Sequence, residues 1–254
     1  GEGANQWSTG DRVFYHGDLS KAGGFAEYAI TTAHTTARIP DGVGFAEAAA
    51  VPCAGLTAYE AVVRRLNVQP DHIVWMQGGA GGVGGFAVQM CANIGAAVIT
   101  TASERNHEYV KSLGASYAID YANEDVVARI MEITKGRGGD RVLAAVDEAT
   151  ADQGIEVLAF RGGLATVAGL PQLAESTFDN ARSVHRIAYG GAHTSSNREA
   201  QVDLALMAEE MIALVAEKTI DPMIEQVIGL DDIPEGLAQL ETRHVRGKIV
   251  AELV

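Results

Sequence analysis

A run of glycines directly after a short apolar segment is the feature that most constrains this chain. The segment MQGGAGGVGGFAVQM, residues 76–90, carries glycine at positions 78, 79, 81, 82, 84 and 85. Gly79, Gly81 and Gly84 satisfy the spacing G-x-G-x-x-G between an apolar run and an apolar helical pattern. In that setting the first glycine permits a tight turn, the second lets a pyrophosphate approach the backbone, and the third packs the helix against the strand. The sequence therefore predicts a turn that binds a dinucleotide.

The helix expected after this turn gives a second reason to predict an anion site. Its first N–H groups have no partner within the helix, and the aligned peptide dipoles place positive charge at that end. Residues assigned to cofactor binding here are Gly79, Gly81, Gly82, Val83 and Gly84. The alternative is a glycine-rich turn with no ligand, which the flanking strand and helix disfavour.

Short apolar runs alternate with helical periods from residue 73 onward. Strands are expected at residues 73–76, 97–101, 117–119, 142–146, 164–168 and 187–189. Helices are expected between them at about residues 83–94, 105–113, 123–134 and 150–160, with Asn123 as an N-cap and with Gly162 and Gly163 after a helix end. This alternation is typical of βαβ units. The predicted fold class is therefore α/β, with a Rossmann doubly wound parallel sheet of six strands.

Two flanking segments do not follow this alternation. The segment GGFAEYAITTAHTTARIP reads as strands with turns. Near the other end a long helix is expected at about 199–218, followed by the segment MIEQVIGL, a short helix after Pro234 and the strand GKIVAELV. We expect the flanks to meet in one antiparallel, β-rich domain. The predicted division is a first part at 1–55, a dinucleotide-binding domain at 56–200, and an interdomain helix with a return to the first part at 201–254.

The residues after the second expected strand decide which dinucleotide is favoured. An acidic residue there would bind the ribose 2'-hydroxyl of NAD and repel the 2'-phosphate of NADP. Thr101 stands at the expected strand end and is not acidic, whereas Ser103 and Arg105 could bind a 2'-phosphate, Arg105 as a charge-assisted donor. Glu104 lies at the usual distance of an NAD acid from Gly84, but beyond the expected strand end. These residues favour NADP over NAD. The alternative for Ser103 and Arg105 is that they form a solvated helix start and bind no cofactor.

The composition of the chain excludes several classes of partner. Among 254 residues there are 33 acidic and 19 basic side chains, and the formal net charge of -14 makes a nucleic-acid partner unexpected. No stretch approaches the roughly 18 uninterrupted apolar residues of a membrane span, so no membrane partner is expected. Cys53 and Cys91 form no CxxC pair, which fits a reducing compartment, and we expect a cytoplasmic location.

Seven segments carry a family resemblance that covers almost the whole chain. They are GDRV at 10–13, GGFAEYA at 23–29, AAAVPCAGLTAYEAV at 48–62, GGAGGVGGFAVQ at 78–89, SLGASYAIDY at 112–121, GGLATVAGL at 162–170 and RGKIV at 246–250. In these segments, and in their order, the chain resembles the medium-chain dehydrogenase/reductase superfamily, in particular its quinone oxidoreductase-like branch. The motifs are more specific for the superfamily than for the branch.

The resemblance implies an architecture for the whole protein. It implies a GroES-like catalytic domain, split in sequence, that packs against the Rossmann domain with the active site in the cleft between them. It also implies that roughly the first quarter of a full-length protein precedes Gly1. A homodimer is expected, in which the sixth strand, near RIAYGGAH, pairs with its mate across a two-fold axis.

Several residues acquire a cofactor role only through this resemblance. Thr57 resembles the threonine whose hydroxyl lies beside the nicotinamide ring, with a helix-start hydroxyl as the alternative. Gly169 and Leu170 resemble the backbone that flanks the nicotinamide carboxamide. Tyr121 resembles a tyrosine at the adenosine end, with a core aromatic as the alternative. Asn106 stands where zinc-free NADPH reductases often carry a lysine, which weakens the NADP assignment.

Zinc is not expected in this chain. The segment after GDRV passes to the next motif without the four closely spaced cysteines of the family's structural zinc lobe. Cys53 stands at the position of the third ligand of the catalytic zinc. We interpret it as a buried small residue, with a zinc ligand as the alternative. One cysteine does not define a site, because tetrahedral zinc needs three protein ligands and an open position.

The histidines do not strengthen the case for a metal. They show no H-E-x-x-H motif and no close pairing, and are interpreted as surface or satisfied residues: His16, His34, His72, His107, His185, His193 and His244. His193 is the exception, because it follows the last expected strand and could face the cleft. Cys91 shares a helix stripe with apolar residues and is interpreted as core.

Together the motifs predict an NADPH-dependent reductase. It would transfer hydride to a small-molecule quinone or α,β-unsaturated carbonyl without a metal. Hydroxyls or backbone N–H groups would meet the developing negative oxygen, and no catalytic acid is assigned. One alternative is a zinc-dependent alcohol dehydrogenase, with Cys53 as a ligand and zinc as the Lewis acid. Another is a non-catalytic, nucleotide-binding relative that has lost turnover.

Overall fold

The chain forms two compact units. The computed structural model describes residues 4–21, 23–173 and 181–253. One unit, here called the terminal unit, joins Gly1–Leu56 to Tyr189–Val254, and the other, the central unit, is Thr57–Ala188.

The second boundary lies earlier in the chain than predicted. The first observed boundary follows Leu56, one residue from the predicted position, whereas the second precedes Tyr189 rather than residue 201. Tyr189 belongs to the terminal unit, where its hydroxyl donates to the backbone oxygens of Pro52 at 2.9 Å and Cys53 at 3.1 Å.

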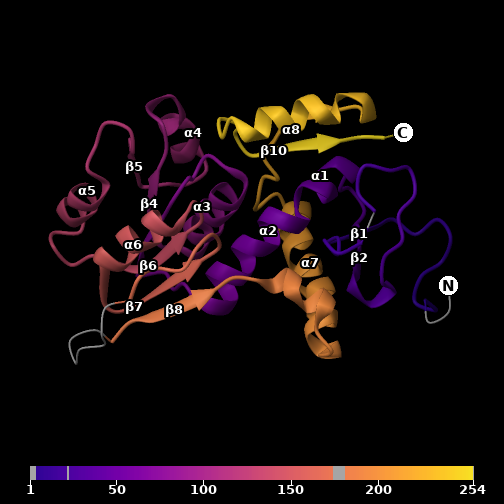
Figure 1. Ribbon diagram of the computed structural model, residues 1–254, viewed down its shortest axis with the longest axis horizontal. Helices are drawn as coiled ribbons and strands as arrows, with labels where there is room; N and C mark the ends of the chain where they lie inside the picture. Colours follow the sequence, from indigo (N-terminus) through magenta and orange to yellow (C-terminus); the bar gives the residue numbers. More distant parts are fainter. Residues whose placement is uncertain (1–3, 22, 174–180, 254) are drawn as a thin grey trace. The chain divides into compact units, whose positions relative to one another are not determined.

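The central unit is built around one parallel sheet of six strands (Figure 1). The strand order is β5-β4-β3-β6-β7-β8, and every neighbouring pair runs parallel. The chain therefore starts at β3 in the middle and winds outward in both directions, and the predicted Rossmann doubly wound sheet is confirmed. The strands are β3 (Ile73–Met76), β4 (Ala97–Thr101), β5 (Tyr117–Ile119), β6 (Gly139–Ala144), β7 (Leu158–Thr166) and β8 (Ser183–Arg186).

Helices connect the strands from β3 to β7. The longest of them, α3, is followed by Gly95, whose φ of 97° is the left-handed conformation that commonly closes a helix. The connecting helices are α3 (Gly82–Ile94), the 3-10 turn η3 (Glu104–Asn106), α4 (His107–Ser112), α5 (Val126–Ile133) and α6 (Glu148–Glu156).

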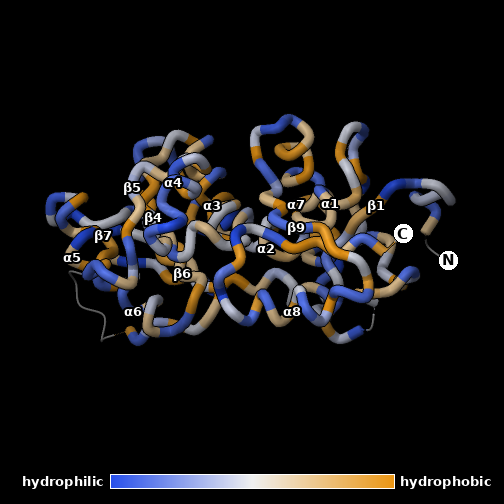
Figure 2. The backbone as a smooth tube through the Cα atoms, turned by 90° about the horizontal axis from the view of Figure 1, so that it is seen from above, coloured by the Kyte–Doolittle hydropathy of each residue, from blue (hydrophilic) through white to orange (hydrophobic). Residues whose placement is uncertain are grey.

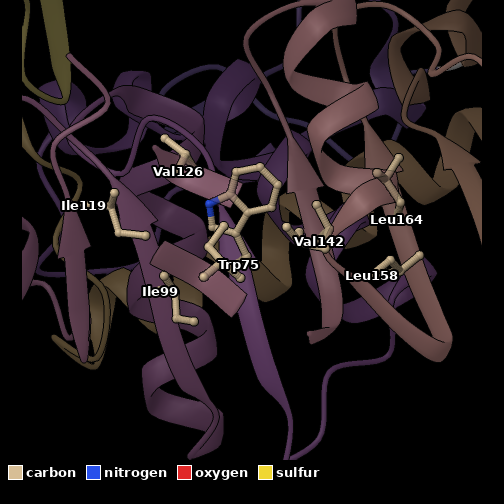
Figure 3. Packing of buried hydrophobic residues seen from close by; sticks show 9 residues of the cluster. Trp75, Ile99, Ile119, Val126, Val142, Leu158 and Leu164 are labelled. Carbon is tan, nitrogen blue, oxygen red and sulfur yellow. The ribbon is translucent and has the colours of Figure 1, made fainter. Parts of the chain in front are cut away.

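One face of the sheet carries a buried apolar cluster. Trp75 of β3 is paired with Ile99 of β4 and Val142 of β6, so these side chains point to the same side. They cluster with Ile119 and Leu164 from further strands and with residues of α5, as Figure 3 shows. Each fully buried aliphatic side chain contributes about 1.5–3 kcal/mol to stability.

The opposite face of the sheet is also buried. Met76, Val98 and Leu143 alternate with the first set along their strands, and each is fully buried. The helix α3 contacts β3 and β4 and contributes buried Phe86 and Val88. A sheet covered on both faces explains why these strands read as apolar runs rather than as an alternating pattern.

The region around β7 differs from the prediction. The helix predicted at 150–160 is wrong at its end, because β7 already begins at Leu158. Short apolar runs such as EVLAF do not distinguish a buried helix turn from a strand. Gly139 of β6 pairs with Leu158 of β7, and Arg141 pairs with Gly163. Between these two pairs β7 has more residues than β6, so β7 contains a bulge.

This bulge explains two mispredicted glycines. Gly162 and Gly163 lie inside β7 and not after a helix, so their assignment as a helix end is wrong. Arg161, just before them, has a φ of 63°, and the neighbouring Phe160 is exposed. The bulge therefore points large side chains away from the sheet and leaves the glycines where the strand resumes.

The last strand and one helix cap were also mispredicted. The strand expected at 187–189 is wrong, because β8 precedes it at Ser183–Arg186, a polar and half-exposed edge strand. Edge strands of this kind lack the apolar run on which the prediction depended. The cap of α5 is Asp125, whose carboxylate accepts from the backbone of the helix. The side chain of Asn123 instead donates to Asp120 at 2.6 Å.

The terminal unit contains two small sheets. β1 (Val13–Tyr15) is antiparallel to β2 (Thr36–Arg38), whereas β9 (Ile224–Ile228) is parallel to β10 (Lys248–Ala251). Parallel neighbours need a crossover, and α8 (Ile233–Glu241) provides it. Hydrophilic and hydrophobic residues alternate along α8 (Figure 2). The prediction of one antiparallel domain is therefore wrong for β9 and β10.

Several helices complete the terminal unit. They are η1 (Ala33–Thr35), α1 (Phe45–Ala50), the first part of α2 (Pro52–Tyr59), η4 (Tyr189–Thr194), the long helix α7 (Arg198–Ala216) and η5 (Leu230–Asp232). The unit boundary after Leu56 divides α2, and its second part continues into the π-helix η2 (Glu60–Arg65) of the central unit. Residues 23–32, predicted to contain strands, contain none, and Tyr28 and Ile30 are exposed. No helix in the described ranges is long and apolar enough to cross a membrane.

Candidate cofactor site and terminal-unit pocket

The glycine turn follows β3 and has no room for side chains at two positions. A Cβ atom on Gly79 would lie 2.3 Å from Oγ1 of Thr100 in the neighbouring strand. A Cβ atom on Gly84 would lie 2.2 Å from the backbone oxygen of Gly78. Both distances are far below van der Waals contact, so glycine is required at each position. Gly78 itself has a φ of 63°, which places the turn's left-handed residue just before the predicted motif.

The end of β4 holds this turn by hydrogen bonds. The backbone N–H of Gly78 donates to the hydroxyl of Thr101 at 3.1 Å, and the N–H of Gly79 donates to the backbone oxygen of Thr101 at 3.1 Å. The hydroxyl of Thr100 donates to the backbone oxygen of Met76 at 2.8 Å. Thr101 was predicted as a cofactor residue, and in the structure it is buried and positions the glycine turn.

The first turn of α3 fits an anionic group. Gly81 precedes the helix and provides no side-chain cap, and the first intrahelical bond of this region joins the Gly85 N–H to the Gly81 oxygen at 2.8 Å. Helix geometry leaves the N–H groups of Gly82, Val83 and Gly84 without an intrahelical acceptor. A helix start without a side-chain cap, next to a turn that only glycine can form, fits the pyrophosphate of a dinucleotide.

The residues after β4 form a short polar turn. Ser103 precedes η3, and its Oγ accepts a hydrogen bond from the Asn106 amide at 3.2 Å. Arg105 and Glu104 are both exposed. Asn106 therefore orients Ser103. The same turn leaves one positive and one negative group accessible, the Arg105 guanidinium and the Glu104 carboxylate.

The predicted cofactor residues share one edge of the sheet. Because all strands are parallel, the segments that follow β3, β4, β5 and β7 lie at the same carboxyl edge. Gly79, Ser103, Tyr121 and Gly169 follow these four strands in that order. Open α/β sheets bind their ligands at this edge, so the topology brings together residues that are far apart in sequence.

The remaining predicted residues have defined surroundings. Tyr121 is 57% exposed, so the alternative of a core aromatic is wrong. Thr57 is buried within α2, so the alternative of a helix-start hydroxyl is wrong. Gly169 has a φ of 85°, its oxygen accepts from the Thr166 hydroxyl, and a Cβ there would lie 2.9 Å from the backbone of Glu148. The neighbouring Leu170 is 49% exposed.

The terminal unit contains a pocket of about 650 Å³. It is lined by residues of β1, α1, α2 and β10 and by residues that follow β1, β2 and β10. His16, which follows β1, lines this pocket together with Cys53 of α2.

His16 and His193 form a pair that the sequence did not indicate. Nδ1 of His16 lies 3.2 Å from Nε2 of His193, although 177 positions separate the two residues. Their ring planes differ by 16°, and Tyr189 packs against His16 at 4.9 Å between ring centroids. The two residues are far apart in the sequence, in agreement with the absence of a close pairing there, and in the structure each is the other's partner. No spacing motif could reveal a contact between residues so distant in the chain.

The pair changes the protonation of His16. Burial lowers the pKa of His16, and the electrostatic interaction with His193 lowers it further, whereas Asp18 opposes the shift. Three other histidines have hydrogen-bond partners, as expected: His34 has Gln201, His72 has the Gln69 N–H, and His107 has a backbone oxygen.

The two cysteines have different surroundings. Cys91 is fully buried, which confirms its interpretation as core, and burial raises its pKa to about 12. Cys53 is exposed, so its interpretation as a buried small residue is wrong. Burial lowers the pKa of nearby Lys248, and the interaction with Cys53 opposes that shift. Among the described residues no three His, Cys, Asp or Glu side chains are placed to hold a metal ion, and the expectation about zinc stays a prediction.

A parallel doubly wound sheet with a glycine turn after its central strand defines a Rossmann-type α/β protein. Residues 82–209, half of the chain, match the model of the zinc-binding dehydrogenase family. The protein belongs to this family.

Individual relatives agree with this assignment. A zinc-type alcohol dehydrogenase-like protein of Schizosaccharomyces pombe is 30% identical over 239 residues, which cover 92% of this chain and 67% of the relative. The structure of the quinone oxidoreductase from Coxiella burnetii is 28% identical, with a TM-score of 0.81 over 98% of this chain and 74% of that one. A mycobacterial protein solved in complex with NADPH is 27% identical, with a TM-score of 0.82 over 96% of this chain and 76% of that one.

These similarities confirm the resemblance to quinone oxidoreductase-like members of the medium-chain dehydrogenase/reductase superfamily. The chain spans about two thirds of the length of the curated relatives that it matches.

Proposed function

We propose that this protein is an NADPH-dependent reductase that transfers hydride to a quinone or an α,β-unsaturated carbonyl without a metal. The observation that carries the proposal is the glycine turn between β3 and α3, where only glycine fits at positions 79 and 84 and the helix start is uncapped. A mycobacterial relative bound NADPH in its structure, and a Coxiella relative is named a quinone oxidoreductase.

Each part of the cofactor has a proposed binding group in the central unit. The N–H groups of Gly82, Val83 and Gly84 would bind the pyrophosphate. Arg105 and Ser103 would bind the 2'-phosphate, Arg105 through a charge-assisted hydrogen bond. The resemblance assigns Tyr121 to the adenosine end, and Thr57, Gly169 and Leu170 to the nicotinamide end. The bound cofactor supplies hydride, and the chain supplies position and electrostatics.

Arg105 is the residue on which the preference for NADPH over NADH depends. Its guanidinium is accessible at the carboxyl edge of the sheet, beside the exposed Glu104. The guanidinium would donate charge-assisted hydrogen bonds to a 2'-phosphate, whereas the carboxylate would accept a hydrogen bond from a 2'-hydroxyl. The proposal of NADPH therefore requires that Arg105, and not Glu104, contacts the ribose.

The decisive experiment combines metal content with turnover. Metal is measured by mass spectrometry on the purified chain, and oxidation of NADPH and NADH is followed with 1,4-naphthoquinone and with an enal. Near-zero zinc with turnover that prefers NADPH supports the proposal. Binding of NADPH without turnover of any acceptor would instead favour a non-catalytic relative.

A zinc-dependent alcohol dehydrogenase is the second candidate. The exposed Cys53, which lines the terminal-unit pocket, favours it, because its sulfur is accessible to a metal and a catalytic zinc keeps one position open for a substrate. Stoichiometric zinc that is lost in Cys53→Ala, together with oxidation of alcohols, would establish this candidate and overturn the zinc-free reductase.

We further propose a homodimer and a cytoplasmic location. β8 is an edge strand of the central sheet with a half-exposed side, and pairing with a second copy would cover it. Neither Cys53 nor Cys91 forms a disulfide, which supports a reducing compartment. Light scattering of the purified chain tests the dimer, and a mass of one chain across micromolar concentrations contradicts it.

A further inference from the structure

The helix at the start of the central unit contains a turn that is not α-helical. After α2 (Pro52–Tyr59) the chain continues as the π-helix η2 (Glu60–Arg65). At its end the backbone N–H of Leu66 donates to the oxygen of Ala61 at 2.9 Å, whereas in an α-helix the acceptor would be Val62. Turns of this kind are rare and are frequently found at functional sites. The side chains of η2 should therefore show what holds the turn.

An ion pair inside η2 has the spacing of a π-helix. Oε1 of Glu60 accepts from Nε of Arg65 at 3.0 Å and from Nη2 of the same residue at 2.9 Å. The two residues are five positions apart, so a π-turn brings them to the same side of the helix. In an α-helix, at about 100° per residue, they would face directions about 140° apart. The ion pair therefore favours the π register.

Glu60 depends on this partner because it is buried. Its side chain is 7% exposed, whereas that of Arg65 is 51% exposed. Its second oxygen, Oε2, is buried and has no hydrogen-bond partner in the described part of the chain. A buried carboxylate without its cation is strongly unfavourable, because the charge is then uncompensated. Relaxation of η2 to an α-helix would separate the two side chains, so the ion pair opposes that relaxation.

The far end of the π-turn is fixed on the central sheet. Leu66 is buried, and its backbone oxygen accepts from Nε of Arg141 in β6 at 2.6 Å. Its Cδ2 lies 3.4 Å from the position that a Cβ atom on Gly163 of β7 would take. η2 also contacts α3. Because Leu66 is held in this way, the register of η2 determines how the residues before it are rotated.

Thr57 lies in the helical turn before η2 and would be moved by a change of register. One residue more or less between Thr57 and Leu66 rotates Thr57 by about 100° around the helix axis and shifts it by about 1.5 Å along the axis. Thr57 is buried and belongs to the central unit, which also contains the glycine turn. A hydroxyl can form a hydrogen bond with a fixed ligand atom from one of these two positions and not from the other.

We propose that the Glu60–Arg65 ion pair holds η2 in the π register and thereby positions Thr57 for the nicotinamide end of NADPH. This inference rests on the proposed function, which assigns Thr57 to that end of the cofactor. Glu60 and Arg65 are positioning residues, because they act through Thr57. A buried ion pair that selects one register contributes specificity of structure rather than stability.

The first test measures the register itself, without cofactor. In the wild type, through-hydrogen-bond NMR coupling should connect the N–H of Leu66 to the carbonyl carbon of Ala61. Arg65→Gln removes the cation and should move this coupling to Val62, whereas Arg65→Lys keeps the charge and should leave it at Ala61. Coupling to Ala61 in Arg65→Gln would overturn the role of the ion pair.

A second variant covers the case in which Arg65→Gln fails to fold. Glu60→Leu combined with Arg65→Leu replaces the ion pair by apolar side chains, a change that is often tolerated without loss of stability. This double variant should fold and yet show the coupling from Leu66 to Val62. If the folded double variant keeps the coupling to Ala61, the π register does not depend on the charges and the inference is wrong.

Cofactor binding tests the consequence for the nicotinamide end. The ligands are NADPH and 2',5'-ADP, which carries the adenosine and the 2'-phosphate but no nicotinamide, each titrated by calorimetry. Arg65→Gln should raise the Kd for NADPH about 2- to 10-fold, because one hydrogen bond is lost, and should leave the Kd for 2',5'-ADP unchanged. Arg129→Gln, which removes the same charge from an exposed ion pair with Glu132, is the control and should change neither Kd. Equal losses for both ligands in Arg65→Gln would overturn the positioning role.

Two combinations test whether the effect passes through Thr57 and through the register. Thr57→Val should reproduce the loss of NADPH affinity and add nothing to Arg65→Gln, because both remove the same contact. Deletion of Val63 makes Ala61 the fourth residue before Leu66, so an α-turn then keeps the same hydrogen bond. In that background Arg65→Gln should leave the Kd for NADPH unchanged. Additive losses, or an undiminished loss in the deletion background, would overturn the inference.

Binding to the wild type separates this inference from the proposed function. A wild type that binds neither NADPH nor 2',5'-ADP contradicts the proposed function, and the positioning of Thr57 is then overturned with it. A wild type that binds NADPH, together with an Arg65→Gln variant that binds it equally well, overturns the positioning role alone and leaves the reductase intact.

Discussion

Gly79 and Thr100 lie so close that a Cβ atom on the glycine would be 2.3 Å from the threonine Oγ1. The threonine cannot easily move away, because its hydroxyl donates to the backbone oxygen of Met76 at 2.8 Å. Gly79→Ala should therefore lower the free energy of unfolding by about 1–3 kcal/mol, as overpacking in a core does. Urea denaturation of the variant measures this change.

Gly24→Ala is the matched control for that substitution. Among the described residues, no atom beyond its chain neighbours lies within 4 Å of a Cβ added at Gly24, and its φ is not in the left-handed region. The control should change the free energy of unfolding by less than about 0.5 kcal/mol. If Gly79→Ala is as stable as Gly24→Ala, the close packing of the glycine turn against β4 is contradicted.

Arg105 should control the choice between the two cofactors. Arg105→Ala removes the proposed donor to the 2'-phosphate and should weaken NADPH binding on the order of 10-fold, with little change for NADH. Calorimetric titration with both cofactors measures the two Kd values. Lys111→Ala, on the neighbouring helix α4, removes the same charge from an exposed pair with Glu108 and serves as the control. Equal losses in the two variants would indicate a general charge effect and not a specific contact.

The parts that the sequence predicted well are those whose signals are local. The turn at Gly79, Gly81 and Gly84 lies between a strand and a helix, all within 25 residues. The strand pattern, the glycine spacing and the helix pattern each support the same prediction. The run EVLAF failed because its length fits a helix turn or a strand, and only pairing of Leu158 with Gly139 decides the matter. The contact between His16 and His193 depends on how the two flanks of the chain come together, and no periodicity encodes that.

The two thiols should differ completely in reactivity. Ellman's reagent should modify one thiol per chain in the native protein and two after unfolding in guanidinium, because Cys53 is exposed and Cys91 is buried. Cys53→Ala should reduce the native count to zero. Reaction of two thiols in the native state would contradict the buried position of Cys91 in α3.

Cys91 also predicts a loss of stability in alkaline solution. Its pKa is raised to about 12 in the folded chain, whereas an unfolded thiol ionises near 8.5. A raised pKa contributes stability that is complete below the unfolded value and is lost as pH rises from about 8.5 toward 12. Cys91→Ala should therefore show a smaller decrease in the free energy of unfolding between pH 8 and pH 10 than the wild type, measured by urea denaturation.

His16 predicts the opposite dependence on the acidic side. Burial and the neighbouring His193 lower its pKa in the folded chain, so the unfolded chain binds more protons as pH falls through the ordinary range of histidine. This contribution to stability is complete above about pH 6.5 and is lost as pH falls toward the lowered value. His16→Gln should make the free energy of unfolding less sensitive to pH between about 7.5 and 5, whereas His244→Gln, at an exposed position, should keep the wild-type slope. Identical slopes in the wild type and His16→Gln would contradict the lowered pKa of His16 in the folded chain.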